Sequence, residues 1–357
     1  MKETLSNSGN DWEAPQVRQQ LFSHQLRVVR GVSAKDGEEH FHPLQLRSIS
    51  SQTPLTFAFY LKVMNAGDKS LHYLPFCTPR EVFQDDWLTH LQAMKIDRLY
   101  FHNDDIDLVI DHLNDFLTLL ELQEQDTTRQ QMEMFYEHMN LTLARAWNAP
   151  RLGPHIHSVI RQVEWIIREI QQKEMPFHLL REILLKDYSI YNHAVNVFLI
   201  SLGFMIFTRY DYLDCRHMAV GALFHDVGLG RTPLEVILKP EPLSPEELQE
   251  IQKHPRLGYE LLRDCPEFPA ESLRLVLEHH ENADGSGYPH KLSLNRQHPH
   301  TRILRLVDAY DSLTCQRSYR PAQGVFQALK TIRSQEGANG PVFDHQVLAK
   351  FIQFLAV

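Results

Sequence analysis

Several features that would quickly narrow the class of this protein are missing from its sequence. The cysteines Cys77, Cys215, Cys265 and Cys315 are far apart and form no CxxC pair, which argues against a structural zinc cluster or a disulfide framework. No uninterrupted apolar run reaches the roughly 18–20 residues that cross a bilayer, and the longest, Val197–Phe207, has 11. The polar N-terminus lacks the apolar segment of a signal peptide. These absences predict a cytoplasmic protein without a membrane partner.

The sequence also lacks an excess of positive charge. The formal net charge of -9 argues against a partner that is a polymeric nucleic acid or a membrane surface. A small anionic substrate remains compatible with that charge, because a local metal cluster can outweigh it. With 43% hydrophobic residues in 357, the chain is long enough for two domains that each bury a core.

The first part of the chain combines strand and helix patterns. Short β-branched and aromatic runs separated by turn residues predict strands at 44–50, 57–64, 71–76 and 97–102. Helical spacing of apolar residues predicts helices at 81–95 and 107–125. We therefore predict a small α+β domain over residues 1–125, with a sensory or regulatory role and no ligand that its sequence identifies.

Residues 126–174 are predicted to form a helical linker of one or two long helices, interrupted near Ala149-Pro150 and Gly153-Pro154. Such a connector could form a homodimer with its copy, or it could pack on its own domain, and the sequence favours neither. After Met175 the strand signals fade and helical periodicity continues to residue 357. Within that part, Ser244 and Pro245 predict the N-cap and first position of one helix.

Residues that can bind metal recur in consecutive helical segments of this last part. A single histidine on a helix is usually structural, but helices packed around a common axis can project several ligands to one point. The candidates are His193, His225, Asp226, His254, His279, His280 and Asp308. Imidazoles together with carboxylates suit iron, manganese or zinc. An aspartate directly after a histidine can bridge two ions, and two bridged ions can generate hydroxide and neutralise a phosphate.

Four segments, LFHDVG, KHPRLGYELL, HHENADGSGYP and LVDAYDSLTCQRSYR, make residues 185–330 resemble the HD-GYP family of the HD phosphohydrolases. The resemblance implies an all-α HD-type helical catalytic domain over residues 175–357, preceded by the small α+β N-terminal domain. It also implies a metal-dependent phosphodiesterase of bacterial signal transduction. Such an enzyme hydrolyses the second messenger cyclic di-GMP with a metal-bound hydroxide, giving linear pGpG and, in a further step, GMP.

Roles carried over from the family fall on matching positions of this chain. All seven candidates above would be metal ligands, His225 and Asp226 would be catalytic, and Asp226 would be the bridge. The turn formed by Gly287, Tyr288 and Pro289 would lie beside the dinucleotide, and Arg317 and Arg320 would clamp its phosphates. Of the neighbouring acids, Asp284 is expected to brace this loop. Asp311 is expected to cap its own helix or to hydrogen-bond within it.

Two positions depart from the family pattern. Ser189 stands where many members have a glutamate that helps to bind a third metal, so we expect two divalent ions, iron or manganese, with zinc as the other candidate. Leu229 replaces a lysine, and Arg231, two residues further on, is the nearest alternative cation. Losing one cation that stabilises a transition state can slow a reaction by on the order of 10²–10³.

Three functions are compatible with this pattern. The first is the cyclic di-GMP phosphodiesterase, and the alternative is a cyclic-dinucleotide receptor with little or no turnover, which Ser189 and Leu229 favour. The complete ligand set favours the enzyme. A hydrolase of ordinary nucleotides is disfavoured by the Gly-Tyr-Pro turn, while a mixed cyclic GMP–AMP substrate stays open.

Overall fold

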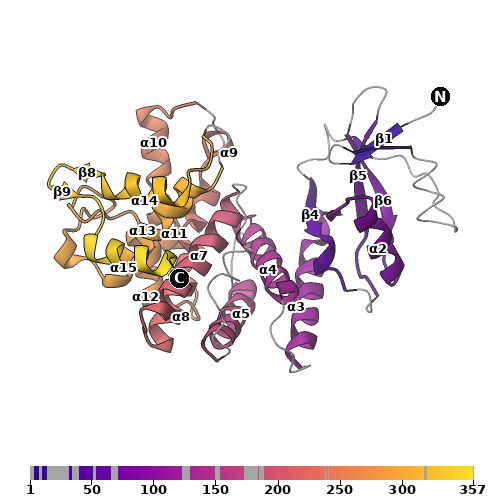
Figure 1. Ribbon diagram of the computed structural model, residues 1–357, viewed down its shortest axis with the longest axis horizontal. Coiled ribbons are helices and arrows are strands. Elements are labelled where there is room, and N and C mark those ends of the chain that lie inside the picture. The colour runs from indigo at the N-terminus through magenta and orange to yellow at the C-terminus, as the bar shows by residue number, and fades with distance from the viewer. Residues whose placement is uncertain are drawn as a thin grey trace. The chain divides into compact units, whose positions relative to one another are not determined.

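A computed structural model describes residues 4–7, 10–13, 32–33, 40–50, 54–65, 71–122, 129–148, 153–172, 184, 189–237, 239, 241–316 and 320–356. The chain divides into two compact units, Met1–Leu141 and Thr142–Val357 (Figure 1). The predicted boundaries at residues 125 and 174 stay predictions.

The first unit is built on a seven-stranded antiparallel sheet with β2, β1, β5, β6 and β3 in order, while β7 pairs with β5 and β4. The strands are β1 (Thr4–Asn7), β2 (Asn10–Glu13), β3 (Val32–Ser33), β4 (Phe41–Gln45), β5 (Phe59–Asn65), β6 (Leu71–Cys77) and β7 (Arg98–His102). The helices are η3 (Leu46–Ser48), α2 (Asp85–Ala93), η4 (Asn103–Asp105), α3 (Ile106–Leu122) and α4 (Arg129–Asn148), which continues into the second unit.

Aromatic side chains hold the helices of this unit to its sheet. The Phe57 ring lies edge-on to Phe101 of β7 at 6.4 Å and to His112 of α3 at 5.7 Å. On α2, Trp87 lies edge-on to Phe76 of β6 at 5.6 Å. Large aromatic rings bury much apolar surface in a small core, and the predicted α+β class is confirmed.

One predicted strand, residues 44–50, is wrong in extent. The strand β4 covers Phe41–Gln45 and is followed by the short helix η3. Leu46 and Ile49 are both buried, and their three-residue spacing places them on one side of a turn rather than on alternate faces of a strand.

The second unit is helical, as predicted, apart from a short β8–β9 ribbon. Its elements are α5 (Gly153–Gln172), α7 (Ile190–Phe207), α8 (Tyr212–Phe224), η5 (Val227–Arg231), α9 (Leu234–Ile237), α10 (Pro245–Ile251), α11 (His254–Leu262), α12 (Ala270–Glu278), η6 (Leu294–Arg296), α13 (Pro299–Thr314), α14 (Val325–Arg333), β8 (Glu336–Gly337), β9 (Gly340–Pro341) and α15 (His345–Leu355).

Helix α7 lies at the centre of this unit and packs against α8, α13 and α15. Its length and composition would allow it to cross a membrane, and 78% of it is buried inside the protein. A helix that is apolar on every side must be covered by protein on every side. His193 lies in the first turn of α7 and is therefore surrounded by protein.

Capping residues begin several helices around the site. Ser189 accepts a hydrogen bond from the Asn192 amide at 3.0 Å and caps α7. Ser244 and Glu247 form a capping box at the start of α10, with Pro245 at the first position, which confirms the predicted N-cap. Such caps satisfy amides that the helix itself leaves unpaired.

Candidate metal centre

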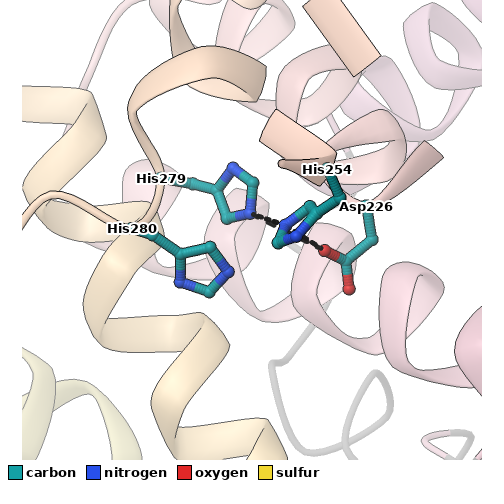
Figure 2. A group of neighbouring side chains, drawn as sticks. All are labelled: Asp226, His254, His279 and His280. Atoms are coloured by element: carbon teal, nitrogen blue, oxygen red, sulfur yellow. Dashed lines mark hydrogen bonds and ion pairs between the residues drawn. The ribbon is translucent and has the colours of Figure 1, made fainter. Parts of the chain in front are cut away.

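The seven predicted ligands lie together in two groups. Within each group, one potential ligand atom per residue lies within 4.8 Å of the others. The first group is Asp226, His254, His279 and His280 (Figure 2), and the second is His193, His225 and Asp308. Figure 2 shows the side chains of the first group converging from three segments of the chain.

Asp226 joins the two groups because its two carboxylate oxygens face different histidines. Its Oδ1 atom lies 3.1 Å from Nε2 of His254 and 3.6 Å from Nε2 of His279. Its Oδ2 atom lies 3.3 Å from Nε2 of His225 and 3.8 Å from Nε2 of His193. This is the arrangement that a carboxylate bridging two cations requires.

A glycine allows Asp226 to approach α11. Asp226 follows the C-terminal end of α8 and precedes η5, which packs on α11. A Cβ atom on Gly228 would lie 2.0 Å from the carbonyl oxygen of His254 and 2.5 Å from the amide nitrogen of Gly258. Backbone atoms this close leave room only for glycine, so this residue sets the distance between Asp226 and His254.

Three of the histidines are oriented by backbone carbonyls three residues earlier in the chain. The Nδ1 atoms of His225, His254 and His279 lie 2.7, 2.7 and 2.8 Å from the carbonyl oxygens of residues 222, 251 and 276. Because a carbonyl can only accept, each Nδ1 carries the proton, and the Nε2 lone pair is left for a metal.

His193 is oriented by a carboxylate instead. Its Nδ1 atom lies 2.7 Å from Oδ2 of Asp311, and its Nε2 atom lies 3.2 Å from Oδ1 of Asp308. Asp311 also accepts from Nδ2 of Asn196 at 3.1 Å. Asp311 also accepts from the thiol of Cys315 at the end of its own helix, as predicted, but its contacts with α7 were not predicted. Asp308 and Asp311 are three residues apart, so both project from the same face of α13 toward α7.

Burial and local charge set the protonation of the site. Burial would raise the pKa of Asp226, but the neighbouring imidazoles of His225, His254 and His279 hold it well below its usual range. Burial opposes protonation of His193, but Asp308 and Asp311 outweigh it and raise its pKa to about 10. Burial lowers the pKa of His279 to about 4. Asp226 is thus ionised and His279 is neutral, as metal ligation needs.

The donor set fits a pair of divalent cations. The Nε2 atom of His225 is buried without a hydrogen-bond partner among the described residues. The Nε2 atoms of His254 and His279 face each other at 3.0 Å (Figure 2), although the protons of both rings are on Nδ1. Lone pairs directed at one another, and a buried orphan nitrogen, are costly unless a cation lies between them. Imidazole and carboxylate donors suit a transition metal.

The predicted loop lies at the edge of these ligands. The Tyr288 ring stacks on His280 with centroids 4.8 Å apart. Glu281 accepts hydrogen bonds from the amides of His290 and Leu292 at 2.6 and 2.7 Å and so holds the loop. Asp284 accepts from the amide and hydroxyl of Ser286, which confirms that it braces the turn.

The remaining predicted residues lie in different surroundings. The Arg320 guanidinium donates to the carbonyls of Leu313 and Ser312, at the end of α13. Arg317 lies outside the described residues. Leu229 is buried in η5, and Arg231 is exposed.

Two residues to which the sequence analysis gave no role lie at the site. Glu281 is described above, and Arg305 of α13 lies with Nη1 3.7 Å from Oδ2 of Asp308. The signal that could have found Arg305 is its spacing of three residues from Asp308 on one helix.

The comparisons with known proteins agree with one another on the kind of domain that this chain contains. A family model described as an HD domain matches residues 207–347. A cyclic di-GMP phosphodiesterase of Pseudomonas aeruginosa is 27% identical over 184 residues, 51% of this chain and 44% of that protein. The cyclic di-GMP phosphodiesterase response regulator RpfG of Xanthomonas campestris is 35% identical over 125 residues, 35% of this chain and 33% of that protein. The match thus spans less than half of either relative.

A solved structure shows the same fold over most of the chain. It is Bd1817, an HDG"Y"P protein from Bdellovibrio bacteriovorus, with a TM-score of 0.64 and 18% identity, covering 89% of this chain and 100% of that one. The second unit of the chain therefore carries an HD domain with a candidate metal centre. Residues 207–347 match the HD domain family, as the motifs of this part of the chain predicted.

Proposed function

We propose that the chain is a metal-dependent phosphodiesterase that hydrolyses cyclic di-GMP to linear pGpG, and in a further step to GMP. The observation that carries this proposal is the position of Asp226, whose two oxygens face two separate sets of histidines. A centre of this kind has no evident structural use in a helical domain whose core is already apolar. It does suit hydrolysis of a phosphodiester.

Two ions bound by these groups would supply a nucleophile near neutral pH and neutralise charge on the phosphate. The residues of the chain provide the surroundings for that chemistry. Asp226 and Asp308 contribute negative charge that holds the cations, and the carbonyl-bound imidazoles keep their lone pairs directed inward. Tyr288, stacked on His280, offers an aromatic surface beside the reacting phosphate, where a base could pack.

We propose iron or manganese as the resident metal, with zinc as the other candidate, and two ions rather than three. The donor chemistry supports a transition metal of this group, because imidazole and carboxylate ligands bind all three of these metals. Ser189 is occupied as the cap of α7, and a neutral hydroxyl is a weaker ligand for a third ion than a glutamate would be.

A second candidate is a cyclic-dinucleotide receptor that binds without turnover. The buried, uncharged Leu229 favours it, because leucine cannot stabilise charge on a phosphate. The retention of seven potential ligands at one place favours the enzyme. Chemistry at the metal centre is therefore the leading proposal.

The test of the proposed function is chromatography of the products of cyclic di-GMP. The chain is reconstituted without oxygen with Fe(II) or with Mn(II), and Asp226→Ala is the control. We expect linear pGpG with the wild type only. Intact substrate in a sample with full metal content and measurable dinucleotide binding would favour the receptor. Mixed cyclic GMP–AMP, assayed in parallel, tests the base preference.

The cellular setting is also a proposal. The four cysteines form no disulfide in the described structure and three of them are buried, which supports the cytoplasm as the location. For the linker, α5 packs on α8 and Arg216 donates to Glu164 at 2.8 Å, which supports packing on its own domain. A homodimer through the linker stays a proposal, and light scattering of the purified chain would test it.

A further inference from the structure

We infer that Arg305 binds a phosphate oxygen of the substrate beside the metal centre, and so supplies a cation that Leu229 cannot. This inference rests on the proposed phosphodiester substrate. It differs from the expected phosphate contacts, which fall on Arg317 and Arg320.

Arg305 lies where the metal ligands meet the Tyr288 loop. It is one helical turn before Asp308 on α13, and its Nη1 atom lies 3.7 Å from Oδ2 of that ligand. The same Oδ2 atom lies 3.9 Å from Nδ1 of His280, and the His280 ring stacks on Tyr288.

The guanidinium is held in one orientation by the protein. Its Nε atom donates to Oδ1 of Asn282 at 3.0 Å, and Cζ lies 4.8 Å from the centroid of the Phe343 ring. The side chain is 19% exposed. A planar guanidinium stacked on one face and bonded through Nε keeps its two Nη groups on the opposite edge.

Those two Nη groups are available to an anion. Among the residues that the structure describes, neither has a hydrogen-bond acceptor, and the ion pair with Asp308 is longer than a hydrogen bond. Two parallel N–H groups match two oxygens of one phosphate. A phosphate drawn to cations near Asp308 would meet them directly.

Other basic residues of the described second unit bond to other protein groups or lie beyond ion-pair distance of the ligands. Arg320 bonds to the end of α13, and Arg302 bonds to Asp344 at 3.1 Å. Within the described residues, Arg305 is the one arginine or lysine within ion-pair distance of any of the seven candidate ligands.

The test uses inorganic phosphate as the probe and the full chain loaded with Mn(II). Paramagnetic relaxation of the phosphorus NMR signal reports phosphate near the metal, and elemental analysis reports metal content. Arg305→Gln is compared with Arg302→Gln, a matched control that removes the same charge from the same helix. We expect phosphate affinity to fall about 10- to 100-fold in Arg305→Gln, with metal content retained, and to stay within twofold of wild type in Arg302→Gln.

Equal phosphate affinity in wild type and Arg305→Gln would overturn the inference, as would absence of phosphate binding to the loaded wild type. Loss of metal from Arg305→Gln alone would also overturn it, because Arg305 would then be a support for Asp308. If that variant does not fold, Arg305→Met, which keeps the stem packed on Phe343, is assessed by the same criteria. If Arg305→Gln binds phosphate more weakly but the loaded wild type leaves cyclic di-GMP intact, the proposed function is refuted and the role of Arg305 in binding phosphate stands.

Discussion

The Oδ2 atom of Asp311 on α13 lies 2.7 Å from the Nδ1 atom of His193 on α7, so the two helices are joined through a buried charged hydrogen bond directly behind a metal-facing nitrogen. Both side chains are almost fully buried, with 2% and 3% of their surface exposed. The contact fixes the imidazole ring and raises its basicity, which is the usual function of a group behind a ligand.

Replacing Asp311 should weaken the second ligand group selectively. In Asp311→Ala the His193 ring loses its partner, and we expect affinity for one of the two ions to fall about 10- to 100-fold. Metal content after dialysis against a weak chelator should therefore fall toward half that of wild type. Retention of the full content would show that burial alone orients His193. Asp311→Asn, which still offers an acceptor, should lie between the two.

Ser189 should act on stability and not on metal binding. Its side chain caps α7, and losing such a cap costs about 1 kcal/mol. Ser189→Ala should lower the free energy of unfolding in urea by that amount with the metal content unchanged. Loss of metal from this variant would instead make Ser189 a ligand. Ser189→Asp, which preserves a cap, is the control for the stability effect.

Gly228 should tolerate no side chain. In Gly228→Ala the added methyl would meet the carbonyl of His254 at 2.0 Å, and the backbone of α11 cannot move aside without moving His254. We expect a loss of about 3 kcal/mol of stability together with weaker metal binding. The comparison is Gly324→Ala, where a Cβ meets nothing within 4 Å. Similar behaviour of the two variants would disprove the close approach.

His300 should make the protein less stable in acid. Burial, together with the charge of His298, lowers its pKa to about 4, although Asp214 opposes the shift. The unfolded chain takes up a proton near pH 6.5, so stability is lost as the pH falls from about 6.5 to 4. The loss should amount to about 1–3 kcal/mol, because the partly exposed Asp214 offsets part of the cost of burying the charged ring.

Urea unfolding of wild type and His300→Gln between pH 7 and 4 measures that contribution. The difference in unfolding free energy between the two proteins should shift in favour of His300→Gln as the pH falls. A difference independent of pH would mean that His300 takes up a proton equally well in the folded state. The metal-binding histidines are common to both proteins, so their titration largely cancels.

Much of the site could be predicted before any coordinates because its ligands are repeated chemical types at fixed places in helical segments. The pairs His225-Asp226 and His279-His280 need no knowledge of the fold to suggest a bridge and two ligands. The predicted helices of the second unit, and the cap at Ser244, follow from local periodicity and local hydrogen bonds. Strand boundaries are harder to predict, as η3 shows. Leu46 and Ile49 are apolar in either conformation, and only the elements that cover them decide whether they belong to a strand or to a turn.

The sequence by itself determined the helical class of the second unit, the seven candidate ligands and the turn at Tyr288, since these depend on residue types and short spacings. Only the tertiary structure decided what surrounds them. In the fold, Asp311 contacts His193 of another helix, and Arg320 donates to a carbonyl at the end of α13. Arg305 lies beside Asp308. The physical reason is that a side chain's partners on other elements depend on how helices pack, and that packing brings together residues more than 100 positions apart, as His193 and Asp311 are.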